Sequence, residues 1–335
     1  MPDYITLEEM FAARDRIAPA ALRTPLHRIE RARLHMGRFP EPAFDLYLKA
    51  ESEQPIGSFK LRGAYNMVAQ LSPEQLKRGV ITYSSGNHAQ GVAYAARALG
   101  AKAVIVMPSN APEVKKAATR ALGAEIVEVG PSSSERRLKA EALVAQHGYA
   151  MIPPYDAREI IAGQATCALE ILEQQPGIDL VIAPVSGGGL LSGTSAAVKL
   201  AAESGLAGAN IQVWGAEPEL AADAKESFDS KQLVEWPAEK TTRTVGDGLR
   251  TQSLGDLNFH HILRFVDGIV TVSEEEIFAA MRVILATTRL VPEPSGAVAL
   301  AAALFHLEQL PRAHKVAVVL SGGNLDPGLR KQLEE

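Results

Sequence analysis

The chain has 335 residues, of which 47% are hydrophobic and 22% are charged, and its formal net charge is −5. This composition is typical of a globular protein with room for two domains, and the absence of a Lys/Arg cluster argues against a nucleic-acid-binding function. No stretch reaches the roughly 18 uninterrupted apolar residues of a membrane span, and the N-terminus has no apolar core of a signal peptide, so we expect a cytoplasmic protein. The single cysteine, Cys167, excludes an internal disulfide and a cysteine-only metal site.

Apolar runs rich in β-branched residues alternate with amphipathic stretches along the chain. The runs predicted as strands are 45–51, 79–85, 102–108, 124–130, 179–187, 211–217 and 315–323, and helices are predicted at 88–100, 135–148 and 273–288. Alternation of this kind predicts an α/β fold with parallel sheets and crossover helices. Residues 79–155 contain three strand–helix units, so we expect them to form a small mobile domain inserted into a large domain made of 1–78 and 156–335.

Four of the predicted strands run into short loops of Ser, Gly and Pro. These loops are SSGN (84–87), MPSNAP (107–112), SGGG (186–189) and SGGN (321–324). In open α/β sheets, ligands bind outside the carboxyl ends of the strands. We therefore expect the four loops to face a common cleft.

The loop SGGGLLSG (186–193) follows an apolar strand and opens a predicted helix. Its glycines allow the backbone to wrap an anion at the helix N-terminus, which indicates a phosphate site. A Walker loop is excluded, and Ser192 replaces the third glycine of the Rossmann fingerprint. Because Glu217 ends the next strand near the position of a ribose-binding acid, a nicotinamide enzyme stays an alternative, as does a merely tight turn.

Lys60 lies between Phe59 and Leu61, after a turn-like segment and before a predicted helix. A single lysine is ordinarily a solvated surface charge, but a desolvated lysine has a lowered pKa and reacts with aldehydes to form a Schiff base. The loop SSGNHAQG (84–91) can hold a carboxylate, although an ordinary helix cap at Ser85 or Asn87 is the simpler interpretation. A phosphate loop, a reactive lysine and a polar partner for a ring nitrogen together are what pyridoxal phosphate requires.

These motifs resemble the fold type II pyridoxal-phosphate enzymes, which are similar to the tryptophan synthase β subunit. Within them the chain resembles the serine/threonine dehydratases and serine racemases. The matching segments, in the family's order, are 51–66, 84–93, 161–171, 186–193, 246–250, 291–302 and 321–324. The resemblance implies two open parallel-sheet domains with the cofactor in the cleft between them.

The resemblance also assigns residues to the cofactor. It implies that Lys60 forms the Schiff base, that Phe59 lies beside the ring, that Glu293 belongs to the cofactor-binding residues, and that Ser321 meets the pyridine nitrogen. Asn87 resembles the residue that binds the cofactor's 3-hydroxyl. The residues resembling the phosphate cradle are Gly187, Gly188, Gly189 and Leu190.

For the substrate, the resemblance implies a carboxylate-binding loop and an acid/base. The loop residues are Ser84, Ser85, Asn87 and His88, and Ser85 matches the acid/base of the racemases. Arg136 falls near a position that some members use against acidic side chains.

A divalent-cation site is also implied by the resemblance. Its ligands are Glu217, the carbonyl of Ala221 and Asp223, and oxygen ligands of this kind suit magnesium, calcium or manganese. A pair of surface acids is the alternative interpretation of the same residues.

The expected activity is β-elimination of L-threonine or L-serine through Lys60, which gives a 2-oxo acid and ammonia. A racemase for serine or aspartate and a 3-hydroxyaspartate dehydratase are alternatives on the same scaffold, with a nicotinamide dehydrogenase more distant. Tyr155 places a hydroxyl where the family often has an apolar ring, which leaves the preferred substrate open. The expected partners are a small amino acid and further copies of the chain, as a dimer or tetramer, but neither nucleic acid nor a membrane.

Overall fold

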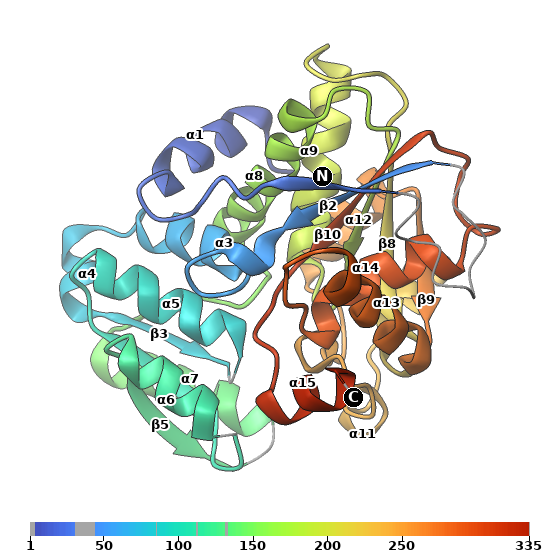
Figure 1. The fold of residues 1–335 in the computed structure, drawn as a ribbon. Coiled ribbons are helices and arrows are strands. Elements are labelled where there is room, and N and C mark those ends of the chain that lie inside the picture. Colours follow the sequence, from blue (N-terminus) through green and yellow to red (C-terminus); the bar gives the residue numbers. More distant parts are fainter. Residues whose placement is uncertain (1–3, 31–43, 85, 112, 131–132, 335) are drawn as a thin grey trace.

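Two sheets organise the molecule (Figure 1). The computed structural model describes residues 4–30, 44–84, 86–111, 113–130 and 133–334. Among these residues, the larger sheet has six strands in the order β1-β2-β10-β7-β8-β9, parallel except for β1. Its strands are β1 (Leu26–Ile29), β2 (Asp45–Ala50), β7 (Leu180–Pro184), β8 (Gln212–Pro218), β9 (Gly268–Val272) and β10 (Lys315–Leu320).

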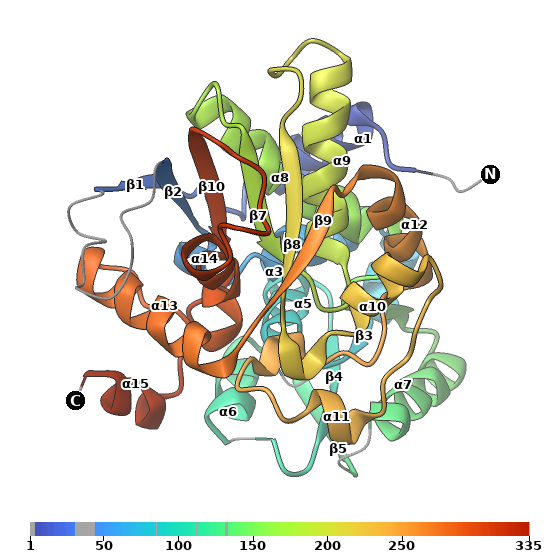
Figure 2. The same cartoon turned by 90° about the vertical axis from the view of Figure 1, so that its right-hand side faces the viewer.

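Helices cover both faces of the larger sheet (Figure 2). One face packs on α13 (Glu274–Thr287) and α14 (Pro294–Phe305), and the other on α8 (Arg158–Gln174) and α9 (Gly189–Glu203). Successive strand residues therefore enter different cores, as Leu46 and Leu48 do on the α14 side and Tyr47 on the α8 side. Burial on both faces explains why these strands are continuous apolar runs.

The smaller sheet has four parallel strands among the described residues, in the order β5-β4-β3-β6. They are β3 (Val80–Tyr83), β4 (Ala103–Pro108), β5 (Glu125–Val129) and β6 (Ala150–Met151). One face packs on α5 (Asn87–Ala98) and on α3 (Lys60–Val68) of the preceding segment, and the other packs on α7 (Ser133–His147). All four strands lie between residues 79 and 155, while the boundaries and the mobility of a separate domain stay predictions.

The remaining helices lie at the margins of these layers. They are α1 (Leu7–Ile17), α4 (Pro73–Arg78), α6 (Glu113–Ala121), α10 (Asp223–Ser230), α11 (Ala238–Thr241), α12 (Asp256–Phe265) and α15 (Pro327–Glu334), with 3-10 turns η1 (Glu51–Glu53), η2 (Glu219–Ala221) and η3 (Asp247–Leu249). Within the described ranges, no helix combines the length and the apolar character that a bilayer crossing requires.

The predicted α/β fold is confirmed, since every predicted strand and helix is present. The prediction missed β1, β6 and β9. All three lie at the edges of their sheets, where each pairs with a neighbouring strand on one side only. Short edge strands leave a weak pattern in the sequence.

Candidate active site

A tight turn brings Lys60 to the carboxyl end of β10. Gly57 adopts a left-handed conformation with φ of +73°, which favours glycine, and Ser58 then pairs with Gly322 in an isolated β-bridge. The Phe59 N–H donates to the Ser321 carbonyl at 3.1 Å, and α3 begins at the next residue. Lys60 is thus the first helical residue, fixed directly beside the SGGN loop.

The Lys60 side chain is half-buried. Its Nζ donates to the Pro154 carbonyl at 2.7 Å and lies 5.2 Å from the centre of the Phe59 ring. Burial lowers the pKa of Lys60 from 10.5 to about 8. The interpretation of Lys60 as a solvated surface charge is therefore wrong, and its amine can be neutral in mildly alkaline solution.

A chain of polar side chains connects the loops around Lys60. Asn87 Nδ2 donates to Glu293 Oε1 at 2.7 Å, and Asn324 Nδ2 donates to Asn87 Oδ1 at 2.7 Å. These two bonds fix the orientation of the Asn87 amide, which keeps one N–H for a further acceptor. Burial, then the charge of Asp247, raises the pKa of Glu293 to about 7, against the hydrogen bond from Asn87.

The loop after β7 has the geometry of an anion cradle. Ser186 and Gly188 both have positive φ, of 59° and 96°, and Gly188 immediately precedes α9. The first N–H groups of a helix have no acceptor within it and point toward such a loop. A side chain at Gly188 would also lie 2.8 Å from Asn258 Cβ, so the position requires glycine for two reasons.

Tyr155 packs against this cradle and was not assigned to it by the sequence. A Cβ on Gly187 would lie 2.4 Å from the Tyr155 ring, so the glycine permits this contact. A cavity of about 230 Å³ opens beside the ring, between β3 and the loop before α12. Its lining includes Tyr83, Pro154, Tyr155, Ser253 and Asp256. Pro154 therefore contacts the cavity and also accepts the bond from Lys60.

The first turn of α5 contributes a buried neutral histidine. His88 Nε2 contacts the Ile152 carbonyl at 3.0 Å, and burial, followed by the charge of Lys60, lowers the pKa of His88 to about 3. Ser84 accepts a bond from the Gly86 N–H, while Ser85 lies outside the described residues. Gly86, not Asn87, occupies the cap position of α5 without a side-chain bond, so capping by Asn87 is wrong.

Arg136 lies in α7, whose buried side packs on the small sheet. The Arg136 guanidinium is half-buried, and burial lowers its pKa. The neighbouring Arg137, which the sequence did not single out, is near enough to lower the pKa values of Tyr83 and Tyr155 against the burial that raises them. Helix α7 thus brings positive charge toward the cavity.

Glu217 and Asp223 form a buried pair of carboxyl groups. Their exposed fractions are 0% and 1%, so the interpretation as surface acids is wrong. Glu217 Oε2 accepts from the Lys225 N–H at 3.0 Å, whereas Glu217 Oε1 and both Asp223 oxygens have no hydrogen-bond partner among the described residues. Burial raises the pKa values of both groups, that of Asp223 to about 7, and the nearby Asp223 charge raises that of Glu217 further.

No cluster of three His, Cys, Asp or Glu side chains suited to a metal exists in the described ranges. A cation at the buried pair would therefore take two carboxylates and complete its shell with the Ala221 carbonyl and water. The three unpartnered oxygens fit a divalent cation, because a hard cation would satisfy them and remove the mutual repulsion of the carboxylates.

The residues around Lys60 fit pyridoxal phosphate in three respects. The cradle before α9 suits a phosphate, the Lys60 amine has a lowered pKa, and Ser321 lies buried beside Phe59. Two sheets, parallel apart from the edge strand β1, with these loops after their strands define an α/β enzyme of the fold type II pyridoxal-phosphate class.

Comparison with known proteins identifies the family. The model of the pyridoxal-phosphate-dependent enzymes matches residues 17–322. The L-threo-3-hydroxyaspartate ammonia-lyase of Saccharomyces cerevisiae is 41% identical, over 84% of this chain and 83% of that protein. Serine racemase of Schizosaccharomyces pombe is 36% identical, over 96% of this chain and 94% of that protein. The crystal structure of the T.th. threonine deaminase has a TM-score of 0.86 and 44% identity, covering 96% of this chain and 99% of that one.

The chain therefore belongs to the pyridoxal-phosphate-dependent enzymes, in the group that contains the ammonia-lyases and amino acid racemases. This result decides against the nicotinamide alternative, and it confirms the resemblance seen in the motifs.

Proposed function

We propose that the protein is an ammonia-lyase that converts a β-hydroxy amino acid to a 2-oxo acid and ammonia. The observation that carries this proposal is the Lys60 amine, which has a pKa of about 8 and contacts a carbonyl instead of a carboxylate. A carboxylate partner would hold the amine protonated, whereas a carbonyl leaves the neutral form accessible. A neutral amine can bind an aldehyde and can also accept a proton.

The proposed cofactor contacts use the loops that surround Lys60. When bound, pyridoxal phosphate supplies an aldehyde for amines and a ring that withdraws electrons from the substrate's α-carbon. Asn87, oriented by Glu293 and Asn324, donates to its 3-hydroxyl, Ser321 meets the ring nitrogen, and Phe59 lies against the ring. The residues proposed to bind the phosphate through their backbone are Gly187, Gly188, Gly189 and Leu190.

The proposed chemistry of the protein groups centres on one proton. Ser84, Asn87 and His88 hold the substrate carboxylate, and Lys60 Nζ removes the proton from the α-carbon. The hydroxyl group then leaves the β-carbon as hydroxide with the electrons of the C–O bond, while a double bond forms between the α- and β-carbons. Water hydrolyses the released enamine to the 2-oxo acid and ammonia. Because the Ser321 hydroxyl cannot stabilise a positive ring nitrogen as a carboxylate would, the site favours prompt loss of the hydroxyl over long-lived negative charge.

The proposed substrates are L-serine, L-threonine and L-threo-3-hydroxyaspartate. The relatives support all three, because they include a hydroxyaspartate ammonia-lyase, a serine racemase and a threonine deaminase. Tyr83 and Tyr155 line the cavity beside Pro154, and Arg137 of α7, the residue after Arg136, lies close enough to act on both tyrosines. These polar and positive groups favour a β-substituent that is itself polar, which supports hydroxyaspartate among the three.

A racemase is the second candidate, supported by the 36% identity to a serine racemase. Here Ser85 serves as the acid/base on the face of the substrate opposite Lys60. Ser85→Ala is then expected to abolish interconversion of the L- and D-enantiomers and to spare elimination from the L-substrate. Equal loss of both activities would show that Ser85 only positions the substrate.

We further propose that Glu217, the Ala221 carbonyl and Asp223 bind a divalent cation, with magnesium, calcium and manganese as candidates. The support is the set of buried, unpartnered carboxylate oxygens. A small domain at 79–155, a homo-oligomer and a cytoplasmic location stay predictions from the sequence.

The testing experiment measures release of ammonia and 2-oxo acid by the purified protein with added pyridoxal phosphate. The substrates are L-serine, L-threonine and both threo and erythro 3-hydroxyaspartate, each with magnesium and then with a chelator. We expect turnover of at least one L-substrate, reduced by the chelator, and none with Lys60→Ala. Loss of optical activity that outpaces ammonia release would favour the racemase, and turnover by Lys60→Ala would refute the mechanism.

A further inference from the structure

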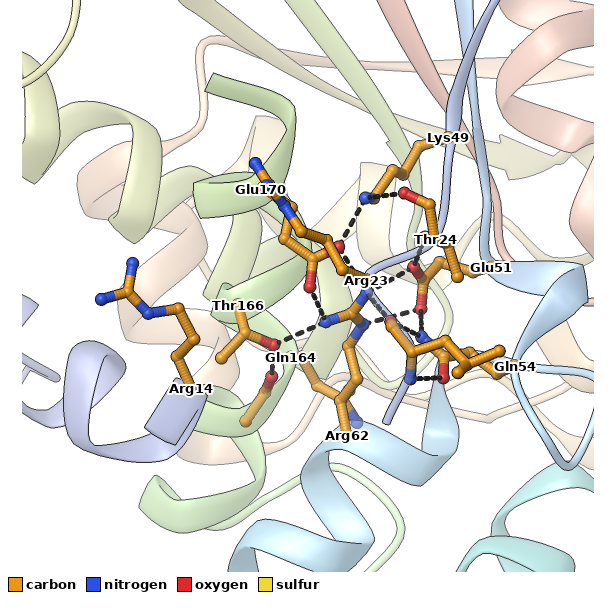
Figure 3. Close-up of polar contacts among 12 residues, drawn as sticks. Arg14, Arg23, Thr24, Lys49, Glu51, Gln54, Arg62, Gln164, Thr166 and Glu170 are labelled. Atoms are coloured by element: carbon orange, nitrogen blue, oxygen red, sulfur yellow. Dashed lines mark hydrogen bonds and ion pairs between the residues drawn. The ribbon is translucent and has the colours of Figure 1, made fainter. Parts of the chain in front are cut away.

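Four charged side chains form a buried cluster beneath the helix that carries Lys60. This buried charge cluster consists of Lys49, Glu51, Arg62 and Glu170 (Figure 3). The side chains are 0% exposed except that of Glu170, at 8%. Two positive and two negative charges give the cluster no net charge.

Arg62 is the centre of this cluster. Its guanidinium forms paired bonds with both carboxylates: to Glu51 at 2.8 and 2.7 Å, and to Glu170 at 2.7 and 2.9 Å. It also donates to Thr166 Oγ1 at 3.1 Å and to the Leu22 carbonyl at 3.3 Å. Every N–H group of the Arg62 guanidinium is therefore used in a hydrogen bond. The planar geometry of the guanidinium fixes where each carboxylate lies.

Arg62 and Lys60 lie on different sides of the first turn of α3. Residues two apart on a helix project in nearly opposite directions. Lys60 Nζ reaches the Pro154 carbonyl, while Arg62 points away into the cluster, between η1 and α8 as Figure 3 shows. Rotation of α3 about its axis would move both side chains, so fixing Arg62 also fixes the direction of Lys60.

The same cluster clamps α3 to α8. The two helices meet at Gly63 and Gly163, where a Cβ on Gly163 would lie 2.6 Å from Gly63 Cα. Arg62 binds Thr166 and Glu170, one and two turns further along α8. Because α8 begins four residues after Pro154, the clamp controls the positions of both partners in the Lys60–Pro154 bond.

A buried ion cluster is a poor device for stability alone, because apolar side chains of similar volume often stabilise a fold as well or better. A fully bonded cluster instead specifies one geometry. We propose that Arg62 is a positioning residue, which holds α3 against α8 and so keeps the Lys60 amine on the Pro154 carbonyl. This inference rests on the proposed role of Lys60 toward pyridoxal phosphate.

The test compares Arg62→Lys with Lys49→Met. In Arg62→Lys, the lysine keeps the positive charge but cannot form the paired bonds of the planar guanidinium. Lys49 is the control position, because it donates its hydrogen bonds to residues that all lie outside α3, namely Thr24, Glu170 and Gln174. The first measurement is the rate at which cofactor-free protein takes up pyridoxal phosphate, followed by absorbance as a function of pH. For Arg62→Lys we expect uptake slowed about tenfold to 100-fold, as displacement by about 1 Å can produce. We also expect the pH at which the uptake rate is half-maximal to move up from about 8 toward 10.5 in this variant.

Lys49→Met is expected to lower the melting temperature at least as much, because it removes one of the two cations that contact the buried Glu170 and leaves the cluster with a net negative charge, but to leave the uptake rate and midpoint unchanged. Wild-type uptake by Arg62→Lys would overturn the proposal, and so would equal changes in both variants. If Arg62→Lys does not fold, Thr166→Val removes one acceptor on α8 at nearly constant shape, and unchanged uptake in that variant would also overturn it.

A second measurement needs no cofactor. The effect of Lys60→Met on the free energy of unfolding depends on the pKa of Lys60 in the folded protein. We compare this effect in the wild-type protein and in the Arg62→Lys variant at several pH values from 8 to 10.5. We expect the pH dependence to shrink in the Arg62→Lys background, and an unchanged dependence would contradict the positioning role. A wild-type protein that takes up no pyridoxal phosphate would refute the proposed function, while this comparison still tests Arg62.

Discussion

Replacing Lys60 by Met should make the cofactor-free protein more stable in neutral solution. Burial lowers the pKa of Lys60 from 10.5 to about 8, a difference of about 2.5 units, and at 1.36 kcal/mol per unit the protonated amine costs the native state about 3 kcal/mol. Methionine removes this cost but also removes the bond to the Pro154 carbonyl, which contributes about 1 kcal/mol. The expected net gain below pH 8 is about 2 kcal/mol.

The sign of the effect changes with pH. Between pH 8 and 10.5 the unfolded chain binds a proton at Lys60 that the native state has lost, so the stability of the wild-type protein rises relative to the variant. Above this window the cost has disappeared, and the variant should be less stable by about 1 kcal/mol because only the lost hydrogen bond remains.

The assay is urea-induced unfolding of both proteins at several pH values across this window. Titrations of all other groups occur in both proteins and cancel in the difference. Lys77→Met, which removes the same charge from α4 at a site away from the Lys60 pocket, is the matched control. A wild-type-minus-variant difference that stays constant from pH 8 to 10.5 would refute the desolvation of Lys60 and the reasoning built on it.

Three further predictions concern the loops and the buried acids. Gly188→Ala should destabilise the protein by about 1–3 kcal/mol, because Gly188 has a positive φ, and should weaken the binding of pyridoxal phosphate measured by titration. Gly208→Ala is the control, because Gly208 has open space around it, and it should change neither quantity. Without metal, stability should fall as pH rises from 3.8 to about 7, where the native state holds the Asp223 proton longer than the unfolded chain. Asp223→Asn should reduce that fall, leaving the part that the buried Glu217 contributes, and should remove the rise in melting temperature that magnesium or calcium gives. Glu293→Gln should remove any limb near pH 7 from the pH profile of turnover, since Gln can still accept from Asn87; a limb that persists would assign it to another group.

The sequence nominated candidate site residues through several motifs taken together. Each feature alone has a simpler interpretation, such as a solvated lysine, a helix cap or a tight turn, and the order of the motifs along the chain, as in the family they resemble, singled out Lys60, Gly188 and Ser321. The contacts that define their roles are between distant segments. The Pro154 carbonyl on Lys60, the Tyr155 ring on Gly187 and the Asn87–Glu293 bond leave no periodic signal in the sequence.

Arg62 shows most clearly what the sequence alone could not predict. In the sequence it is an arginine in an amphipathic helix, where a solvated position is the usual expectation. Only the packing of α3 on α8 reveals that its charge is balanced by Glu51 and Glu170, which lie 11 and 108 residues away along the chain. Burial of a charge depends on partners that a local pattern does not contain.

The buried charge cluster has a consequence for behaviour on heating. The hydration of charged groups becomes less favourable as temperature rises, so the cost of keeping Lys49, Glu51, Arg62 and Glu170 out of water decreases. Their mutual attraction therefore counts for more in a warm protein than in a cold one. We expect the contact between α3 and α8 to be among the last to separate during thermal unfolding, after elements that only apolar packing holds in place.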